Sequence, residues 1–123
     1  MEVRDALALH DRLLALHGGA MGLRDDALLK SALARPQQLY AYADMPDIVG
    51  MAAAYAAGIV RNHPFIDGNK RTGFVVGILF LELNGCRFTA SEEEAAQAVL
   101  TLASGVLDEA GYAAFLRANV KAE

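Results

Sequence analysis

The fold is decided by residues 48–84, which read IVGMAAAYAAGIVRNHPFIDGNKRTGFVVGILFLELN. A helix is predicted from about Asp47 to Asn62, and its nearly uncharged, alanine-rich stretch Ile48–Val60 is shorter than the ~20 apolar residues that a membrane span needs. We therefore expect a buried helix. The segment Asn69–Asn84 has apolar residues on most of its helix surface, which is typical of a helix at the centre of a fold. Between them lies the polar segment His63–Gly68, which its proline and glycine keep out of either helix.

The rest of the chain also has the composition of helices. Alanine and leucine dominate, β-branched residues are sparse, and no segment alternates apolar and polar residues over six or more positions. Further helices are expected over Val3–His17, from Asp25 up to Pro36, as a turn or two over Pro36–Ala43, from Ser91 to about Ala103, and after Asp108. We therefore expect an all-α protein with about six or seven helices around a central apolar helix.

Several predicted boundaries rest on caps and helix breakers. Pro36 either ends one helix or starts the next. The residues Asp44–Asp47 are expected to form a loop and a new cap. Ser91 begins the pattern of a capping box, which a glutamate three residues later completes, and Asp108 is expected to cap the last helix. Residues Cys86–Thr89 are expected to form a short extended link.

Size and composition predict one soluble globular domain over residues 1–123. The chain has 11 Lys and Arg against 15 Asp and Glu, a net charge of −4, and its 54% apolar residues suit a packed core rather than a disordered tail. The single cysteine, Cys86, excludes a disulfide scaffold, so we expect a protein of the reducing cytoplasm. A pI near 5.3 without a Lys- and Arg-rich run argues against direct binding of nucleic acid. No segment is long enough for a membrane anchor.

Reactive side chains are concentrated in the segment Arg61–Thr72, at a density that a structural connection does not need. Gly68 can adopt a positive φ and lets a phosphate approach the backbone closely. The helix that starts at Asn69 has N–H groups without intrahelical acceptors at the positive end of its dipole, which is a site for anions. Lys70 and Arg71 add cationic phosphate donors to its first turn.

His63 and Asp67 flank this anion site. His63 is expected to project from the end of the preceding helix, where an imidazole can take a proton from a hydroxyl nucleophile as a general base. Asp67 has the wrong charge to bind phosphate directly, but it suits a Mg²⁺ between carboxylate and phosphate oxygens. Phe65 is expected to anchor the segment on the core. A base, a metal ligand and a cationic clamp predict the transfer of a phosphate-containing group from a nucleotide to an alcohol.

Other polar and aromatic residues are expected to be structural. His10 and His17 are two helical turns apart, about 10.5 Å along the axis, which is too far to share one metal ion, so we expect half-buried packing residues. Tyr40, Tyr42 and Tyr55 are expected in the core or in a groove rather than stacked on a nucleotide base, with the alternative that one of them near the polar segment lines a base pocket.

The segment His63–Arg71 resembles the signature of the Fic/Doc superfamily, His-Pro-Phe-x-(Asp/Glu)-Gly-Asn-(Gly/Lys)-Arg, at its eight defined positions. The similarity to the death-on-curing (Doc) branch extends over essentially the full length. It includes Leu9–Asp11, Gly18–Gly19, Gly22–Asp25, Ala34–Gln37 and Phe80–Gly85. The resemblance implies a compact helical domain of the Fic/Doc type.

Two positions separate the branches of this superfamily. Fic enzymes that transfer adenylyl groups carry glycine where this chain has Lys70, and a second arginine where it has Phe74. A lysine would crowd the phosphates of ATP in the Fic pose, and the missing arginine removes a clamp on the γ-phosphate. The resemblance to Doc-type proteins implies that ATP is turned round and that its γ-phosphate is transferred to a threonine of elongation factor Tu, which halts translation.

The resemblance also implies roles for single residues. His63 activates the target hydroxyl, Asp67 holds Mg²⁺, and Lys70 and Arg71 complete the catalytic set. The residues implied in binding ATP are Arg61, Gly68, Asn69, Lys70 and Arg71.

The resemblance further implies a partner. Many Fic proteins inhibit themselves through a Ser/Thr-x-x-x-Glu-(Gly/Asn) helix, but the nearest candidate here, Thr89–Glu93, is followed by Glu94. Inhibition is therefore expected from a Phd-type antitoxin, whose disordered tail folds into a groove. The chain would then be the toxin of a type II toxin–antitoxin system.

Two other interpretations stay open at this point. The chain could transfer adenylyl or other nucleotidyl groups. It could also be a catalytically inactive helical module that acts by binding, which Phe74 in place of the second arginine supports.

Overall fold

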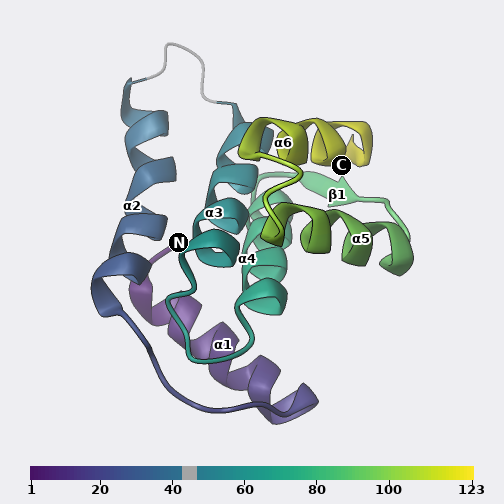
Figure 1. Cartoon of the computed structure of the whole chain (residues 1–123). Coiled ribbons are helices and arrows are strands. Elements are labelled where there is room, and N and C mark those ends of the chain that lie inside the picture. Colours follow the sequence, from purple (N-terminus) through teal and green to yellow (C-terminus); the bar gives the residue numbers. More distant parts are fainter. Residues whose placement is uncertain (43–46) are drawn as a thin grey trace.

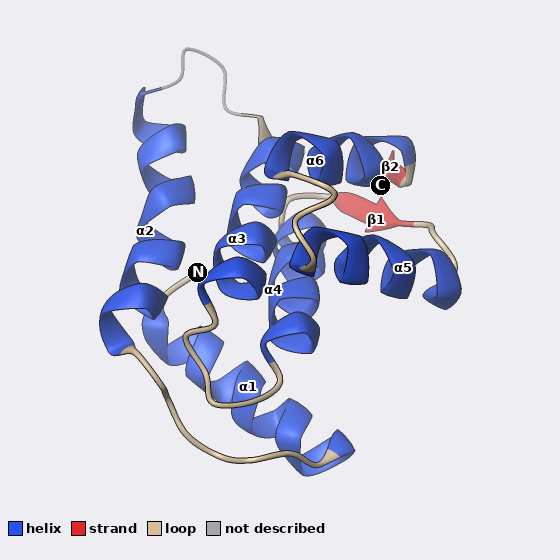
Figure 2. Ribbon diagram, in the orientation of Figure 1, coloured by secondary structure: helices blue, strands red, loops and turns tan. Residues whose placement is uncertain are grey.

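The computed structural model describes residues 1–42 and 47–123, and this part of the chain contains six helices and two short strands (Figure 2). The elements are α1 (Val3–His17), α2 (Asp26–Tyr42), α3 (Ile48–Asn62), α4 (Asn69–Leu83), β1 (Cys86–Phe88), α5 (Glu92–Ala103), α6 (Glu109–Ala118) and β2 (Val120–Ala122). The predicted all-α fold is confirmed, with one small strand pair in addition. None of the described helices is both long enough and apolar enough to cross a membrane.

The central helix is α3. Nine of its residues are buried, and it contacts α2, α4, α5 and α6, which lie around it (Figure 1). By contrast, α4 has six buried residues, and at its far end Leu83 is 72% exposed. The prediction that the helix over Asn69–Asn84 is the central one is therefore wrong, because its neighbour α3 occupies that place. The alanines of α3 make it thin enough for helices to pack on several sides.

Close packing of α3 against α4 depends on two glycines of α4. A Cβ at Gly73 would lie 2.7 Å from Cγ2 of Val60 and 3.0 Å from the carbonyl oxygen of Ala56. A Cβ at Gly77 would lie 3.1 Å from the carbonyl oxygen of Ala52. These contacts leave the two helices little freedom to slide, so the polar segment that joins them has fixed ends.

Helix α2 runs through Pro36 without a break, so the prediction of two shorter helices is wrong. A proline inside a helix removes one backbone donor and crowds the preceding turn. Here Pro36 lies on the same buried stripe as Leu29, Ala32 and Leu33, at spacings of three, four and seven residues. Burial of this stripe, part of which lies against α3, offsets the cost of the proline.

The predicted caps of α5 and α6 are confirmed. The hydroxyl of Ser91 accepts a hydrogen bond from the N–H of Glu94 at 3.1 Å. The carboxylate of Asp108 accepts one from the N–H of Gly111 at 2.7 Å. Both helices therefore begin where the sequence predicts.

The start of α3 is only partly as expected. Asp47 is the residue before the helix, and its carboxylate binds the guanidinium of Arg117 on α6 at 2.6 Å. The remaining predicted loop residues, Asp44–Pro46, lie outside the described residues.

The expected extended link after α4 is the strand β1. It pairs in antiparallel fashion with β2, so that Phe88 lies opposite Val120. The second strand was not predicted, because three residues are too few to show an alternating pattern.

The tyrosines differ in their environment. Tyr55 is 1% exposed and belongs to the core, as predicted, whereas Tyr40 is 55% exposed, so the expectation that it lies in the core or a groove is wrong. The side chain of Tyr42 lies outside the described part of the structure.

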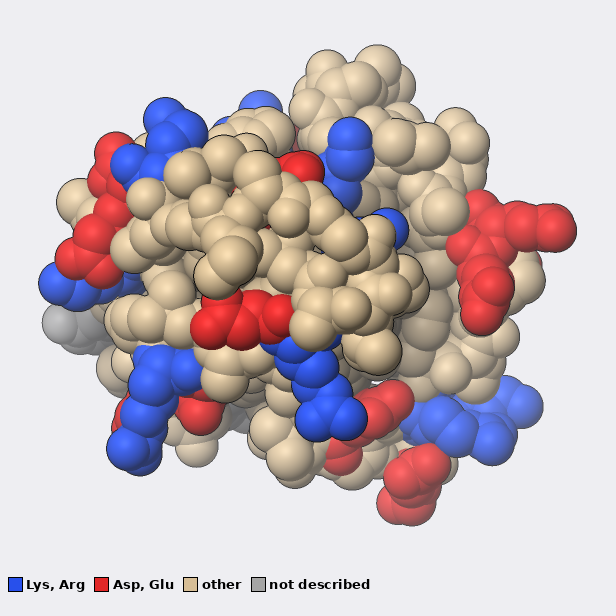
Figure 3. All heavy atoms as spheres, turned by 90° about the horizontal axis from the view of Figure 1, so that it is seen from below, with Lys and Arg blue, Asp and Glu red and all other residues tan. Residues whose placement is uncertain are grey.

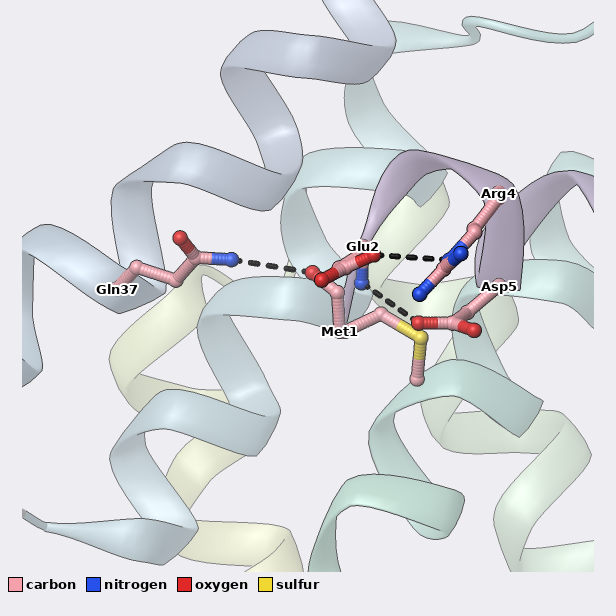
Figure 4. Close-up of polar contacts among 5 residues, drawn as sticks. All are labelled: Met1, Glu2, Arg4, Asp5 and Gln37. Carbon is pink, nitrogen blue, oxygen red and sulfur yellow. Dashed lines mark hydrogen bonds and ion pairs between the residues drawn. The ribbon is translucent and has the colours of Figure 1, made fainter.

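The residue that leads into α1 is joined to α2 by a hydrogen bond, and further polar contacts lie within the first turn of α1 (Figure 4). The amide of Gln37 donates to the carbonyl oxygen of Met1 at 3.0 Å. Within the turn, the N–H of Glu2 donates to Asp5 at 2.9 Å, and Arg4 pairs with the Glu2 carboxylate at 2.9 Å.

Candidate active site

The polar segment between α3 and α4 lies where these two helices end and begin (Figure 1). With the first turn of α4 it forms a pocket of about 290 Å³. The pocket is lined by His63, Ile66, Asp67, Gly68, Asn69, Lys70 and Arg71. The structure thus brings together all the predicted site residues except Arg61.

Arg61 lies in a different hollow, of about 390 Å³, lined by residues of α2, α3 and α6. Its neighbours there include Arg35 and Glu109, which form an ion pair. Two residues along a helix correspond to a rotation of about 200° around its axis. The side chain of Arg61 therefore lies on a different face of α3 from the point where the chain continues into His63. Its predicted contact with ATP therefore has no support from its position.

His63 has an unusual backbone conformation. It caps the C-terminus of α3 with φ 50° and ψ 56°, and it is the single non-glycine residue with a positive φ in the described ranges. Such a conformation costs about 1 kcal/mol or more for a residue with a Cβ. Pro64 adds to this cost, because a residue that precedes a proline favours an extended backbone and His63 is left-handed. Contacts around His63 must therefore hold this conformation, and they leave the side chain exposed at the pocket.

Phe65 anchors the segment on the core, as predicted. Its side chain is 1% exposed and stacks on the ring of His10, with centroids 3.8 Å apart and planes 8° apart. The Nε2 atom of His10 lies 2.7 Å from the carbonyl oxygen of Asp67. The expectation of half-buried packing is wrong for both α1 histidines, since His10 is 2% exposed and supports the segment, whereas His17 is exposed.

Asn69 holds the segment from inside. Its side chain is buried, with Oδ1 accepting from the N–H of Phe65 and Nδ2 donating to the carbonyl oxygen of Phe65, both at 2.9 Å. These bonds fix the orientation of the amide, and its Nδ2 also lies 3.4 Å from Nδ1 of His63. At that distance the contact guides the ring without fixing which nitrogen carries the proton. The phosphate contact predicted for Asn69 is thus left to its backbone N–H.

The carboxylate of Asp67 is exposed but fixed in place. It accepts hydrogen bonds from the N–H groups of Ala20 at 3.1 Å and Gly68 at 2.8 Å. These bonds, with the positive charge of Arg71, hold the pKa of the Asp67 carboxyl below its ordinary value, so it is ionised at neutral pH. Among the described residues, no three His, Cys, Asp or Glu side chains gather as a metal site. A single carboxylate suits Mg²⁺ bound mainly through phosphate oxygens and water.

The start of α4 supplies the positive part of the pocket. Gly68 has φ 79°, and the N–H of Thr72 makes the first bond of the helix, to the carbonyl oxygen of Gly68 at 2.9 Å. The N–H groups of residues 69–71 precede this bond, at the positive end of the helix dipole. Lys70 and Arg71 are exposed beside them. The pocket therefore has the donors and the charge to bind phosphate groups.

A larger apolar groove begins at Lys70 and Arg71. It has a volume of about 740 Å³ and is lined mainly by side chains of α4, β1 and α5, among them Ile78. At its inner side the ring of Phe74 packs edge-on against Phe88, with centroids 5.8 Å apart. The position three residues beyond Arg71 thus carries an aromatic ring and no charge.

A second segment, residues 18–25 between α1 and α2, runs beside the polar segment and braces it (Figure 1). Leu23 and Phe65 form an isolated antiparallel bridge, and the N–H of Ile66 donates to the carbonyl oxygen of Gly22 at 3.1 Å. We call residues 18–25 the brace. The backbone of the brace thus holds the polar segment in place through these bonds.

The brace also approaches the site through its glycines. Gly19 and Gly22 have φ 124° and 116°, and a Cβ would lie 2.8 Å from Asp67 Oδ2 in the first case and 2.9 Å from Ile66 Cδ1 in the second. The contact of Gly19 with Asp67 was not predicted from the sequence. The sequence signal for a close approach was the group of glycines after the first helix. Glycines alone do not indicate which distant segment packs against them.

Charge is spread thinly over the face seen from below. Lys and Arg side chains form separate small groups interspersed with Asp and Glu, and most of the face is uncharged (Figure 3). On this face the positive charge of the described residues is therefore divided into small groups and does not form a broad basic surface.

Comparison with known proteins agrees with this geometry. The model of the Fic/DOC family matches residues 1–81. "Protein kinase doc" of Escherichia phage P1 is 34% identical over 89 residues, which cover 72% of this chain and 71% of that protein. "Toxin Doc" of Mycolicibacterium smegmatis (strain ATCC 700084 / mc(2)155) is 40% identical over 74 residues, 59% of this chain and 57% of that protein. The chain is therefore a member of the Fic/DOC family.

Proposed function

We propose that this protein transfers the γ-phosphate of ATP to a hydroxyl group of another protein. The observation that carries the proposal is the 290 Å³ pocket, in which His63, the fixed carboxylate of Asp67 and the cationic start of α4 lie side by side. A base, one carboxylate and helix N–H groups are the parts that phosphoryl transfer needs, because its catalysis consists mainly of positioning and charge stabilisation.

Each residue would have a defined task in this reaction. His63 accepts the proton of the hydroxyl as the hydroxyl oxygen bonds to the γ-phosphorus. The bond from the γ-phosphorus to the β,γ-bridging oxygen breaks, ADP leaves, and the proton on His63 passes to solvent. Lys70, Arg71 and the N–H groups of the first turn of α4 hold the phosphates. Asp67 would hold Mg²⁺, which offsets the charge of the phosphate oxygens.

Two side chains favour transfer of the γ-phosphate over transfer of the nucleotidyl group. Lys70 lines the pocket at the position where adenylyl-transferring members of the family carry glycine, and its side chain would crowd the phosphates in their pose. Phe74 packs on Phe88 and supplies no cation for the γ-phosphate in that pose. A pocket of this kind suits ATP that presents its terminal phosphate to His63.

The names of the two relatives support a more specific proposal. One is named a protein kinase and the other a toxin. We infer that this protein acts in the cytoplasm as the toxin of a type II toxin–antitoxin system. Its substrate would be a threonine of a translation factor such as elongation factor Tu, and phosphorylation would arrest translation.

The inferred partner is a Phd-type antitoxin whose tail folds into the apolar groove. The groove joins the pocket at Lys70 and Arg71, so a segment bound in it would block access to the phosphate site. A disordered tail suits a long, open and mainly apolar surface of this kind, because it can wrap along the groove as it folds.

The type of transfer is tested with labelled ATP. The purified protein is incubated with purified elongation factor Tu, and separately with bacterial lysate, with ATP labelled at either the α- or the γ-phosphate. We expect label in protein from γ-labelled ATP alone, at a threonine. Label from α-labelled ATP would contradict the proposal and establish nucleotidyl transfer.

The need for catalysis is tested in cells. Induced expression of the wild type is expected to arrest growth, and His63→Ala is expected to abolish the arrest at equal protein level. An arrest of the same strength with His63→Ala would show that the protein acts by binding.

A further inference from the structure

The side chain of Arg24 bonds to the backbone at the end of α3. Its Nε donates to the carbonyl oxygen of His63 at 2.6 Å, and its Nη2 donates to the carbonyl oxygen of Asn62 at 2.8 Å. Both acceptors belong to the turn where α3 ends, and α3 leaves the carbonyl groups of its last turn without helical partners. The guanidinium thus spans two consecutive carbonyl oxygens with one planar fork.

Arg24 is itself held firmly. Its N–H donates to the carbonyl oxygen of Pro64 at 2.7 Å, and the N–H of Asp25 donates to the same oxygen at 2.9 Å. The carboxylate of Asp25 then accepts from the N–H of Leu28 and so caps the start of α2. The arginine therefore connects the start of α2 to the residues on both sides of the His63 backbone.

The backbone of His63 needs such a connection. Its φ of 50° lies in the left-handed region, and the proline after it favours an extended conformation. The N–H of His63 bonds to the carbonyl oxygen of Ile59 at 3.2 Å, which fixes one side of the residue. On the other side, the carbonyl oxygen of His63 is held by Arg24.

We propose that Arg24 is a positioning residue that keeps His63 in its left-handed conformation and so directs the imidazole at the hydroxyl substrate. This inference rests on the proposed function, in which His63 is the general base. Arg24 is not among the residues that line the 290 Å³ pocket, so it would act through the backbone of His63 and not by contact with ATP or the hydroxyl. A displacement of about 1 Å of a catalytic group can cost about 100-fold in rate.

The proposal predicts a difference between arginine and lysine. A lysine keeps the positive charge at the end of α3, but its ammonium is a point charge and cannot reproduce the planar fork. We expect Arg24→Lys to lower kcat about 10-fold and Arg24→Ala about 100-fold, with KM for ATP changed less than about 3-fold. The side chain of Arg24 is exposed, so both variants should keep the helical circular dichroism of the wild type.

A matched control is Arg87→Ala. Arg87 is also an exposed arginine, but it lies on β1, beyond the far end of α4 from the pocket (Figure 1). Its kcat and KM are expected to equal those of the wild type. If Arg24→Ala also kept the wild-type kcat, or if only its KM for ATP rose, Arg24 would not position His63.

The position of His63 is measured independently of any reaction. The chain has three histidines, so protein labelled with ¹³C-histidine gives three resolvable ring signals, and His63→Ala identifies one of them. We expect Arg24→Ala to shift or broaden the His63 signal and to leave that of His17 unchanged. The same spectrum of Arg87→Ala should match the wild type.

The two measurements separate this inference from the proposed function. If the wild type transfers no γ-phosphate but the His63 signal moves in Arg24→Ala, the function fails and the positioning role stands. If the wild type transfers γ-phosphate and the His63 signal of Arg24→Ala is unchanged, the positioning role is refuted and the function stands. If neither is observed, both are refuted.

Discussion

Asn69 shows how one side chain can serve structure and chemistry at the same position. Its amide pairs with both backbone groups of Phe65, much as a strand neighbour would, and the same amide nitrogen borders the ring of His63. The side chain at the start of α4 thereby also holds the segment that carries His63. A donor and an acceptor are both required, and of the side chains of this size the amide supplies both.

The substitution Asn69→Asp tests this double role with almost no change in shape. It replaces the buried donor with an oxygen that faces the carbonyl oxygen of Phe65, so we expect a loss of about 1–3 kcal/mol in the free energy of unfolding. Urea denaturation followed by circular dichroism measures the loss. Asn84→Asp is the matched control, because the Asn84 amide donates to a carbonyl oxygen at 2.8 Å but is exposed. An equal loss for both variants would contradict the role of Asn69.

Asp67 makes the brace sensitive to acid. Its pKa in the folded protein is lowered by the N–H groups of Ala20 and Gly68, so the stabilisation is present above the pKa of the unfolded chain, near 4, and is lost as the pH falls through the lower folded pKa. We expect the amide signals of these two residues to shift in NMR spectra as the pH falls below about 4 and Asp67 is protonated. In Asp67→Asn the same signals should not follow this titration. A wild type without the acid transition would disprove the link.

At this scale the sequence predicts what is local and misses what is distant. His63, Asp67 and Lys70 lie within eight residues, so their chemistry could be recognised together and they do share a pocket. The contacts of His10 and Arg24 with the segment span 57 and 39 residues. A single sequence has no pattern that reports such pairings.

Helices α3 and α4 pack so closely that residues larger than glycine are crowded at two positions of their interface. Gly73 and Gly77 let α4 pack directly against the backbone of α3, and the polar segment connects the two helices. Any change that pushes these helices apart must also displace His63 relative to Lys70. Packing inside the helix pair and geometry in the pocket are therefore coupled.

Gly73→Ala is expected to lower the free energy of unfolding by about 1–3 kcal/mol, because the added Cβ would lie 2.7 Å from Val60 Cγ2 and 3.0 Å from the carbonyl oxygen of Ala56. Thermal unfolding followed by circular dichroism measures the change. Gly50→Ala is a suitable control in the same helix pair, since the three nearest atoms there, the closest at 2.8 Å, belong to the exposed Asp47 and not to a neighbouring helix. Its effect should be within about 0.5 kcal/mol. An unchanged free energy of unfolding in Gly73→Ala would show that α3 and α4 are not closely packed at this position.

The helices were easier to predict than their arrangement. The periodicity of Val3–His17 and the caps at Ser91 and Asp108 are local signals, and these elements begin where expected. Pro36 misled the prediction because burial of the α2 stripe, a tertiary effect, outweighs a local preference. The choice of central helix failed for a similar reason, since the apolar surface of α4 gives no measure of how many helices pack around it.

The whole molecule has two apolar clusters that meet at α3. Ala56 and Val60 belong to the cluster that includes α5 and α6, whereas Tyr55 and Ile59 belong to the cluster that includes α1 and α2. Because adjacent residues of one helix enter both clusters, neither can come apart while the other stays packed. The protein should therefore unfold as one unit.

Scanning calorimetry tests this cooperativity. We expect one transition with equal calorimetric and van't Hoff enthalpies. Leu29→Ala in one cluster and Leu102→Ala in the other should each cost about 2–5 kcal/mol, because both side chains are 0% exposed. Both variants should lower the Tm of the same single transition. Two separate transitions, each moved by one variant, would show independent halves.

The brace has a consequence for the order of events during folding. The helix pair α3–α4 is joined by a short connection, whereas the contacts of His10 and Arg24 with that connection close loops of 57 and 39 residues. Contacts at such sequence separation form late, because their entropy of closure is paid before they gain any stabilisation. We therefore expect His63 to reach its native position only after the helical body has assembled. A molecule still on its way to the native state would already have Lys70 and Arg71 at the start of α4, whereas the imidazole of His63 would not yet be held in place.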